Sequence, residues 1–128
     1  MDFVLTQRCM MKNGIIKVYY GDGKGKTTAA IGQGIMAASE ERSVIIIQFL
    51  KSRNREEMSF ISRLEPEIKL FRFEKSDACF ADLTPEQQAE EKANLRNGMN
   101  FARKVLSTGE CNVLILDEVL GLLDNGII

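Results

Sequence analysis

Residues Tyr19–Ala30 read YYGDGKGKTTAA, and this glycine-rich stretch decides the fold that we expect. It follows an apolar run, Ile15–Tyr20, and leads into a helix-like run, Lys26–Ser39. Successive backbone N–H groups of such a loop form a concavity for phosphate oxygens, and the following helix presents its positive dipole end to the same anion. Lys26 can neutralise the phosphates, and the Thr27 hydroxyl can bind Mg²⁺. The stretch therefore predicts a nucleotide phosphate site.

The match to the phosphate-loop pattern Gly-x-x-x-x-Gly-Lys-[Ser/Thr] is incomplete at its first position. Gly25, Lys26 and Thr27 fit the pattern, whereas Tyr20 stands where the first glycine belongs and Gly21 comes one residue later. We therefore expect the loop to be entered differently from that of an ordinary NTPase. The alternative is a glycine-rich turn without a ligand, but the strand-like run before it and the helix-like run after it favour the phosphate site.

Composition narrows the class of protein. The 128 residues carry a formal net charge of −1, which predicts a single domain, 1–128, with no long-range attraction to nucleic acid or membranes. The three cysteines form no CxxC pair, as is typical of a cytoplasmic protein with reduced thiols. The sequence has no histidine, which excludes His-based zinc sites and Ser–His or Cys–His nucleophile pairs. No apolar run approaches the ~20 residues of a membrane span, and the first residues do not read as a secretory signal.

The rest of the chain alternates strand-like and helix-like segments. Strands are expected over four apolar segments, 15–20, 43–50, 67–73 and 112–116. Helices are expected over 26–39, over 56–64 and from 84 to about 106. This alternation implies a parallel sheet with right-handed crossovers. Residues 1–14 are interpreted as an N-terminal arm outside the core, and residues 119–128 as a short helical or irregular tail.

Local signals refine the two longer helices. Thr84 is the expected N-cap of the last one, with Pro85 at its first position and Gln87 closing a capping box. The residues expected to be buried are Ile31, Ile35, Met36 and Ala38 on the first helix, and Leu95, Met99, Ala102, Val105 and Leu106 on the last. Gly32 and Gly34 weaken the first helix by ~1 kcal/mol each, and close packing on the sheet is the expected compensation.

Asp117 and Glu118 follow the last apolar strand and supply the second half of the predicted site. After a phosphate loop, Asp117 would hold Mg²⁺ or its water, and Glu118 would lie beside the metal or the reacting centre. The alternative is an acidic turn that merely ends a strand, and the upstream loop favours the site. The basic segment 51–57 also follows a strand end, where open α/β sheets bind ligands, and is equally well interpreted as a solvated loop.

Taken together, VYYGDGKGKTTAA, VIIIQFLKS, FRFEK and VLILDEVLGLLDNGII resemble the ATP:corrinoid adenosyltransferases of the CobA/BtuR/CobO type, from Gly14 onward. The most specific pieces are GDGKGKTTAA, QFLK, and LDE followed by an apolar segment. That family also has a non-glycine residue at the position of Tyr20. The resemblance implies an α/β fold with a phosphate-loop, RecA-like parallel sheet flanked by helices. Family members continue past the equivalent of Ile128, so it also implies a C-terminally truncated chain that lacks the last strand or strands.

The resemblance implies an enzyme that transfers the 5′-deoxyadenosyl group of ATP to the Co(I) of a corrinoid, cobalamin or a precursor, and releases triphosphate. Co(I) is itself a strong nucleophile, which agrees with the absence of histidine. The protein would place the ribose carbon in line with cobalt and stabilise the triphosphate. The resemblance further implies Mg²⁺, an electron donor such as a reduced flavoprotein, and a homodimer.

The resemblance also implies the roles of individual residues. The ATP-binding residues would be Gly21, Asp22, Gly23, Lys24, Gly25, Lys26, Thr27 and Thr28. The catalytic residues would be Lys26, Thr27 and Glu118, and those at the metal Thr27, Asp117 and Glu118. Phe80, in the loop 74–83, would contact the corrinoid and help to displace its lower axial ligand; the alternative is that Phe80 simply packs under the loop.

Two hypotheses of other classes stay open at this point. One is a phosphate-loop ATPase or kinase of another line, which needs a residue that positions water or an acceptor near the γ-phosphate. The other is a truncated, non-catalytic ATP-binding module. Analysis of the reaction product separates the first from a transferase, and thermal stabilisation by ATP without turnover favours the second. No basic patch for nucleic acid is evident.

Overall fold

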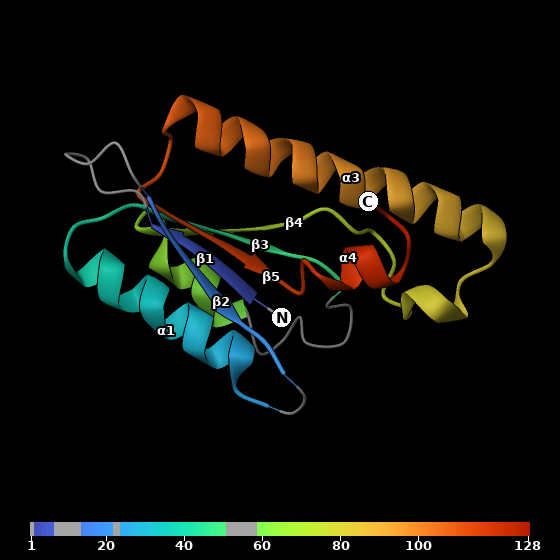
Figure 1. Ribbon diagram of the computed structural model, residues 1–128, viewed down its shortest axis with the longest axis horizontal. Helices are drawn as coiled ribbons and strands as arrows, with labels where there is room; N and C mark the ends of the chain where they lie inside the picture. Colours follow the sequence, from blue (N-terminus) through green and yellow to red (C-terminus); the bar gives the residue numbers. More distant parts are fainter. Residues whose placement is uncertain (1, 7–13, 22–23, 51–58) are drawn as a thin grey trace.

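The computed structural model describes residues 2–6, 14–21, 24–50 and 59–128 (Figure 1). Asp22, Gly23, the basic segment 51–57 and the first residues of the helix expected over 56–64 lie outside these ranges. The strands are β1 (Asp2–Thr6), β2 (Ile15–Tyr19), β3 (Val44–Gln48), β4 (Ile68–Arg72) and β5 (Val113–Asp117). The helices are α1 (Lys26–Ser39), η2 (Phe60–Leu64), η3 (Phe80–Asp82), α3 (Pro85–Thr108) and α4 (Gly121–Asp124), of which η2 and η3 are 3₁₀-helices.

The strands form one sheet in the order β2-β1-β5-β3-β4. β3 pairs in parallel with β4 and with β5, whereas β1 pairs antiparallel with both β5 and β2. Because two antiparallel pairings follow each other, β2 runs in the same direction as β5. Figure 1 shows α1 on one face of the sheet and α3 on the other. The predicted α/β class, with a parallel sheet flanked by helices, is therefore confirmed.

The prediction that residues 1–14 form an arm outside the core is wrong for Asp2–Thr6. These residues form β1, which is inserted between β2 and β5. Each backbone N–H and C=O group needs a partner, and a strand between two others finds partners on both sides. As a result, the strand before the glycine-rich loop pairs with β1 and not with another of the predicted strands.

The two central parallel strands are buried along their whole length. All five residues of β3 and all five of β5 are buried, as expected for a sheet covered on both faces. Alternate residues form two apolar clusters. On the α1 face the strands contribute Val44, Ile46, Ile68, Val113 and Ile115, and on the α3 face Ile45, Ile47, Leu114 and Leu116.

α3 begins as the sequence predicts. The Thr84 hydroxyl accepts a hydrogen bond from the Gln87 N–H at 3.2 Å, and the Thr84 N–H donates to Gln87 Oε1 at 3.0 Å, which completes the capping box. Leu95, Ala102 and Val105 are buried, as expected. The prediction that Leu106 is buried is wrong, since it is 43% exposed. In the described residues no helix is both long and apolar enough to cross a membrane.

α1 has the predicted bounds, but the face that it turns toward the sheet differs from the predicted one. Its buried residues are Ala30, Gly34 and Ala37, so the prediction that Ile35 and Met36 are buried is wrong. A Cβ on Gly34 would lie only 3.0 Å from Ile115 Cδ1, whereas one on Gly32 would meet nothing within 4 Å. Close packing on the sheet therefore compensates for Gly34 alone. The small residues bring the helix close to β5, and the larger side chains of Ile35 and Met36 remain exposed.

Candidate functional site

The loop between β2 and α1 carries the predicted phosphate-binding residues. Gly21 and Gly25 have φ angles of 124° and 109°, which side chains rarely allow. Gly25 is the N-cap of α1, so Lys26, Thr27 and Thr28 form the first turn of the helix. The N–H groups of a first turn have no partner within the helix, and they lie at its positive end. The local backbone therefore suits an anion, as the sequence predicts.

Thr27 connects this loop to the acidic end of β5. Its hydroxyl donates a hydrogen bond to Asp117 Oδ1 at 2.9 Å, between residues 90 positions apart in the sequence. Asp117 is the last residue of β5 and is 1% exposed. A carboxylate can only accept, so the Thr27 proton is directed at Asp117 and the lone pairs of the hydroxyl oxygen can face a cation. The structure thus brings the two predicted halves of the site together.

Glu118, the next residue, has a φ of 62°, in the left-handed region that a side chain enters at a cost of about 1–2 kcal/mol. Leu50 has a φ of 55° just beyond the end of the neighbouring β3. Strained backbone of this kind concentrates at functional sites. Each of the two central strands is therefore followed, at the same edge of the sheet, by a residue with an unfavourable φ angle.

Two further polar residues at this edge, Gln48 and Arg72, lie in segments that carry the family resemblance, QFLK and FRFEK, and the sequence indicated no role for either. Gln48 Nε2 donates to Asp117 Oδ2 at 2.9 Å, and Arg72 Nε donates to Gln48 Oε1 at 2.8 Å. Gln48 is 1% exposed and ends the otherwise apolar strand VIIIQ. A polar residue at the end of a buried apolar run is the signal that could have identified Gln48. Its partners depend on strand register, which the sequence does not show.

The oxygen atoms gathered here suit a hard cation such as Mg²⁺. Thr27 supplies a hydroxyl, and Glu118 follows Asp117 directly in the chain. Both oxygens of Asp117 already accept hydrogen bonds, from Thr27 and Gln48. Asp117 therefore fits a role in orienting the ligands. In the part of the chain that the structure describes, no three His, Cys, Asp or Glu side chains cluster as metal ligands.

Phe80 lies in η3, which Figure 1 shows beyond the carboxyl ends of the parallel strands. Its side chain is half-buried and packs against the apolar cluster on the α3 face. α3 holds this loop at two points: Gln88 Nε2 donates to the Phe80 carbonyl at 3.1 Å, and the Glu91 carboxylate accepts from the Lys75 N–H at 3.0 Å. Phe80 is thus held near the edge where the parallel strands end, and its contact with a corrinoid stays a prediction.

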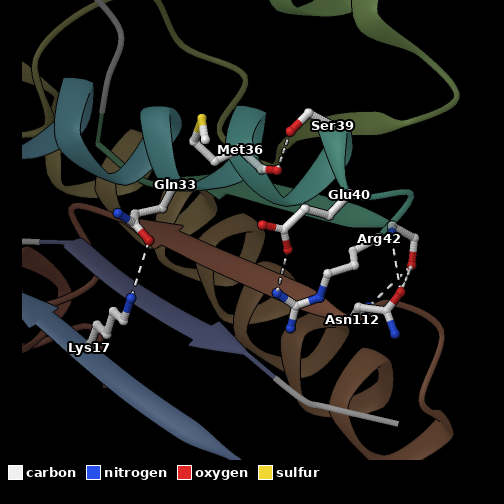
Figure 2. A network of polar contacts seen from close by, with 8 residues as sticks. Lys17, Gln33, Met36, Ser39, Glu40, Arg42 and Asn112 are labelled. Atoms are coloured by element: carbon white, nitrogen blue, oxygen red, sulfur yellow. Dashed lines mark hydrogen bonds and ion pairs between the residues drawn. The ribbon is translucent and has the colours of Figure 1, made fainter.

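The opposite edge of the sheet, where the parallel strands begin, has polar contacts of another kind (Figure 2). Asn112 Oδ1 accepts hydrogen bonds from the Ser43 N–H and hydroxyl at 3.0 and 3.2 Å. Arg42 and Glu40 form an ion pair at 3.7 Å. These contacts close the turn after α1 and join the starts of β3 and β5. No predicted site residue lies among them.

Comparisons with known proteins point to one family. The family model of ATP:corrinoid adenosyltransferase BtuR/CobO/CobP matches residues 12–128. A corrinoid adenosyltransferase of Escherichia coli is 29% identical over 110 residues, which are 84% of this chain and 53% of that protein. Corrinoid adenosyltransferase CobA of Salmonella typhimurium is 48% identical over 40 residues, 31% of this chain and 20% of that protein.

An uncharacterised protein of Nostoc is 29% identical over 125 residues, 90% of this chain and 33% of its own length. No solved structure matches. The chain spans about half the length of the E. coli relative. Because the family model covers most of the chain, this protein belongs to the ATP:corrinoid adenosyltransferase family.

Proposed function

We propose that this chain transfers the 5′-deoxyadenosyl group of ATP to the Co(I) of a corrinoid and releases triphosphate. The observation that carries the proposal is the hydrogen bond from Thr27 to Asp117, in a chain of this family. That bond joins the helix after the glycine-rich loop to the acidic strand end, which supports the proposal that the two segments form one nucleotide site.

In the proposed reaction the electron pair of Co(I) forms the new bond to the ribose 5′ carbon. The bond from that carbon to the triphosphate oxygen breaks, and triphosphate leaves with its electrons. The protein therefore needs no nucleophilic side chain, which agrees with a sequence that contains no histidine. Its task is to hold the reacting atoms in line and to stabilise the charge on the leaving group.

The described residues divide this task. The backbone from Gly21 to Thr28 would surround the triphosphate, and the Lys26 ammonium would offset its charge. Thr27 and Glu118 would hold Mg²⁺, while Asp117 would orient Thr27. When bound, Mg²⁺ would add to the neutralisation of the phosphates. Asp22 near the ribose and Phe80 at the corrinoid belong to the same proposal.

A reduced flavoprotein or another electron donor, a homodimer and a cytoplasmic location also belong to the proposal. Family membership supports the first two. The proposal of a cytoplasmic location rests on composition, since the three cysteines form no CxxC pair.

The test is to incubate the purified chain with ATP, Mg²⁺ and chemically reduced cobalamin and to identify the products. We expect adenosylcobalamin and inorganic triphosphate in equal amounts. ADP and phosphate without a carbon–cobalt bond would instead indicate an ATPase or kinase. Stabilisation by ATP on heating without any turnover would indicate a nucleotide-binding module.

Lys26→Ala tests the assignment of the loop. Removing the ammonium should abolish ATP binding, because the proposal assigns the neutralisation of the triphosphate to Lys26. Lys104→Ala is the matched control, since Lys104 is exposed on α3. Micromolar ATP affinity in Lys26→Ala, measured by calorimetry, would contradict the role of Lys26.

A further inference from the structure

We infer that Gln48 and Arg72 are positioning residues that set the Mg²⁺ affinity of the nucleotide site through Asp117 and Thr27. The inference rests on the proposed function, since it assumes that Thr27 faces Mg²⁺ and nucleotide. It adds two residues from β3 and β4, neither of which lies in the glycine-rich loop or the acidic strand end.

Three residues at strand ends form one row across the carboxyl-terminal edge of the sheet. Arg72, Gln48 and Asp117 are the last residues of β4, β3 and β5. Gln48 is the register partner of both others, so the three side chains emerge on the same face. It is the α1 face, since Ile46 and Ile115, two positions earlier in their strands, pack in the α1 cluster. The row therefore points at the first turn of α1, where Thr27 lies.

The hydrogen bonds of the row have one consistent direction. An arginine side chain only donates, so Arg72 requires the oxygen of the Gln48 amide on its side, at 2.8 Å. The Gln48 NH₂ group must then face Asp117, where it donates at 2.9 Å. Asp117 can only accept, and Thr27 donates to it at 2.9 Å. Arg72 thus fixes the orientation of the Gln48 amide, and the amide in turn holds the Asp117 carboxylate that accepts the Thr27 proton.

A purely structural role does not explain why this row is polar. Gln48 and Asp117 are each 1% exposed, and taking such groups out of water without full pairing costs about 1–3 kcal/mol each. Apolar residues continue the same face in the rows before, with Val44, Ile46, Ile68, Val113 and Ile115. Replacing buried polar groups by well-packed apolar ones is often neutral or stabilising. The polar row ends at the residue proposed to bind the metal, which accounts for its chemistry.

Groups that orient a metal ligand usually change metal affinity about 10–100-fold when they are removed. Gln48→Met keeps the length of the side chain and removes both hydrogen bonds. We expect it to raise the Mg²⁺ concentration for half-maximal ATP binding by about tenfold, while ATP affinity in EDTA stays as in the wild type. Gln33→Met is the matched control, because Gln33 bonds only to Lys17 of β2 among the contacts described.

Arg72 supplies a second pair of variants in case Gln48→Met does not fold. Arg72→Met leaves Gln48 free to rotate its amide, so it should raise the half-maximal Mg²⁺ concentration in the same direction. Arg72→Lys keeps a side chain that only donates hydrogen bonds, so its half-maximal Mg²⁺ concentration should stay at the wild-type value. A thermal scan without nucleotide, run on all variants, separates loss of stability from loss of metal affinity.

The outcomes distinguish this inference from the function on which it rests. A wild-type chain that binds ATP with no dependence on Mg²⁺ overturns both. A Mg²⁺-dependent wild type, with Gln48→Met and Arg72→Met unchanged in half-maximal Mg²⁺, overturns the inference alone. A shift in both variants, with Gln33→Met and Arg72→Lys unchanged, supports it.

Discussion

The two ends of the parallel strands are both lined with polar side chains, and they differ in burial. At the carboxyl ends, Gln48 and Asp117 are each 1% exposed and take part in a row that reaches Thr27. At the amino ends, the ion pair of Glu40 and Arg42 has side chains that are 63% and 27% exposed (Figure 2).

The difference separates two uses of polar groups. Exposed pairs exchange water for protein partners at little net gain, typically ~0–1 kcal/mol. Buried polar groups lose all their contacts with water, so each missing hydrogen-bond partner is costly. Such groups are therefore expected where the orientation of a side chain matters. The amino end thus serves the turn after α1, and the carboxyl end is the part of the molecule that we propose for nucleotide chemistry.

Asp117→Ala should have the largest effect on stability. It removes the acceptor for both Gln48 and Thr27, and we expect a loss of about 3 kcal/mol in the free energy of unfolding. Asn112→Ala at the amino end removes the acceptor for Ser43 and should cost about 1 kcal/mol. Urea unfolding without nucleotide measures both, and equal losses would contradict the contrast between the two ends.

Gly34→Ala and Gly32→Ala test the packing of α1, the helix that runs between the two ends. The new methyl group at Gly34 would lie 3.0 Å from Ile115 Cδ1, so we expect a loss of about 1–3 kcal/mol. Gly32 has open space, and alanine there should stabilise the helix by up to ~1 kcal/mol. If thermal unfolding shows effects of the same sign, α1 does not lie on the sheet as described.

Cys111 lies at the amino end, just before β5, where burial raises its pKa from 9.0 to about 11. The unfolded thiol ionises first, so this contribution to stability is complete below about pH 9 and is lost as the pH rises toward 11. The slope of the decline is at most about 1.4 kcal/mol per pH unit. Cys111→Ala should remove this part of the decline in urea unfolding, whereas Cys79→Ala should keep it.

Glu40→Ala should have the smallest effect. Its partner Arg42 is 3.7 Å away at the surface, so the loss should be below about 0.5 kcal/mol and should vanish at high salt. Arg42→Ala should behave in the same way. A loss above about 1 kcal/mol in urea unfolding would mean that the exposed end contributes more than its surroundings indicate.

Local signals made much of the fold predictable. Thr84 and Gln87 fixed the start of α3, because a capping box depends on residues three apart in the sequence. Gly25 and Lys26 likewise marked the start of α1. The class of the sheet followed from apolar runs that are buried on both faces.

The predictions that were wrong or missing concern how distant segments pack and pair with one another. Ile35 and Met36 are exposed because the rotation of α1 is set by small residues that allow a close approach to Ile115, and hydrophobicity alone favours the larger ones. β1 was missed because its pairing with β2 and β5 depends on strand order. Arg72 was missed for a similar reason, since its partner Gln48 lies 24 positions away across a parallel pair.

The most direct test of the contrast between the two ends is an NMR titration of the labelled chain with ATP and Mg²⁺. We expect amide shifts concentrated at Gly25–Thr28 and at Asp117 and Glu118, with Ser43 and Asn112 unchanged. Shifts gathered at Ser43 and Asn112, or none at the glycine-rich loop, would contradict it.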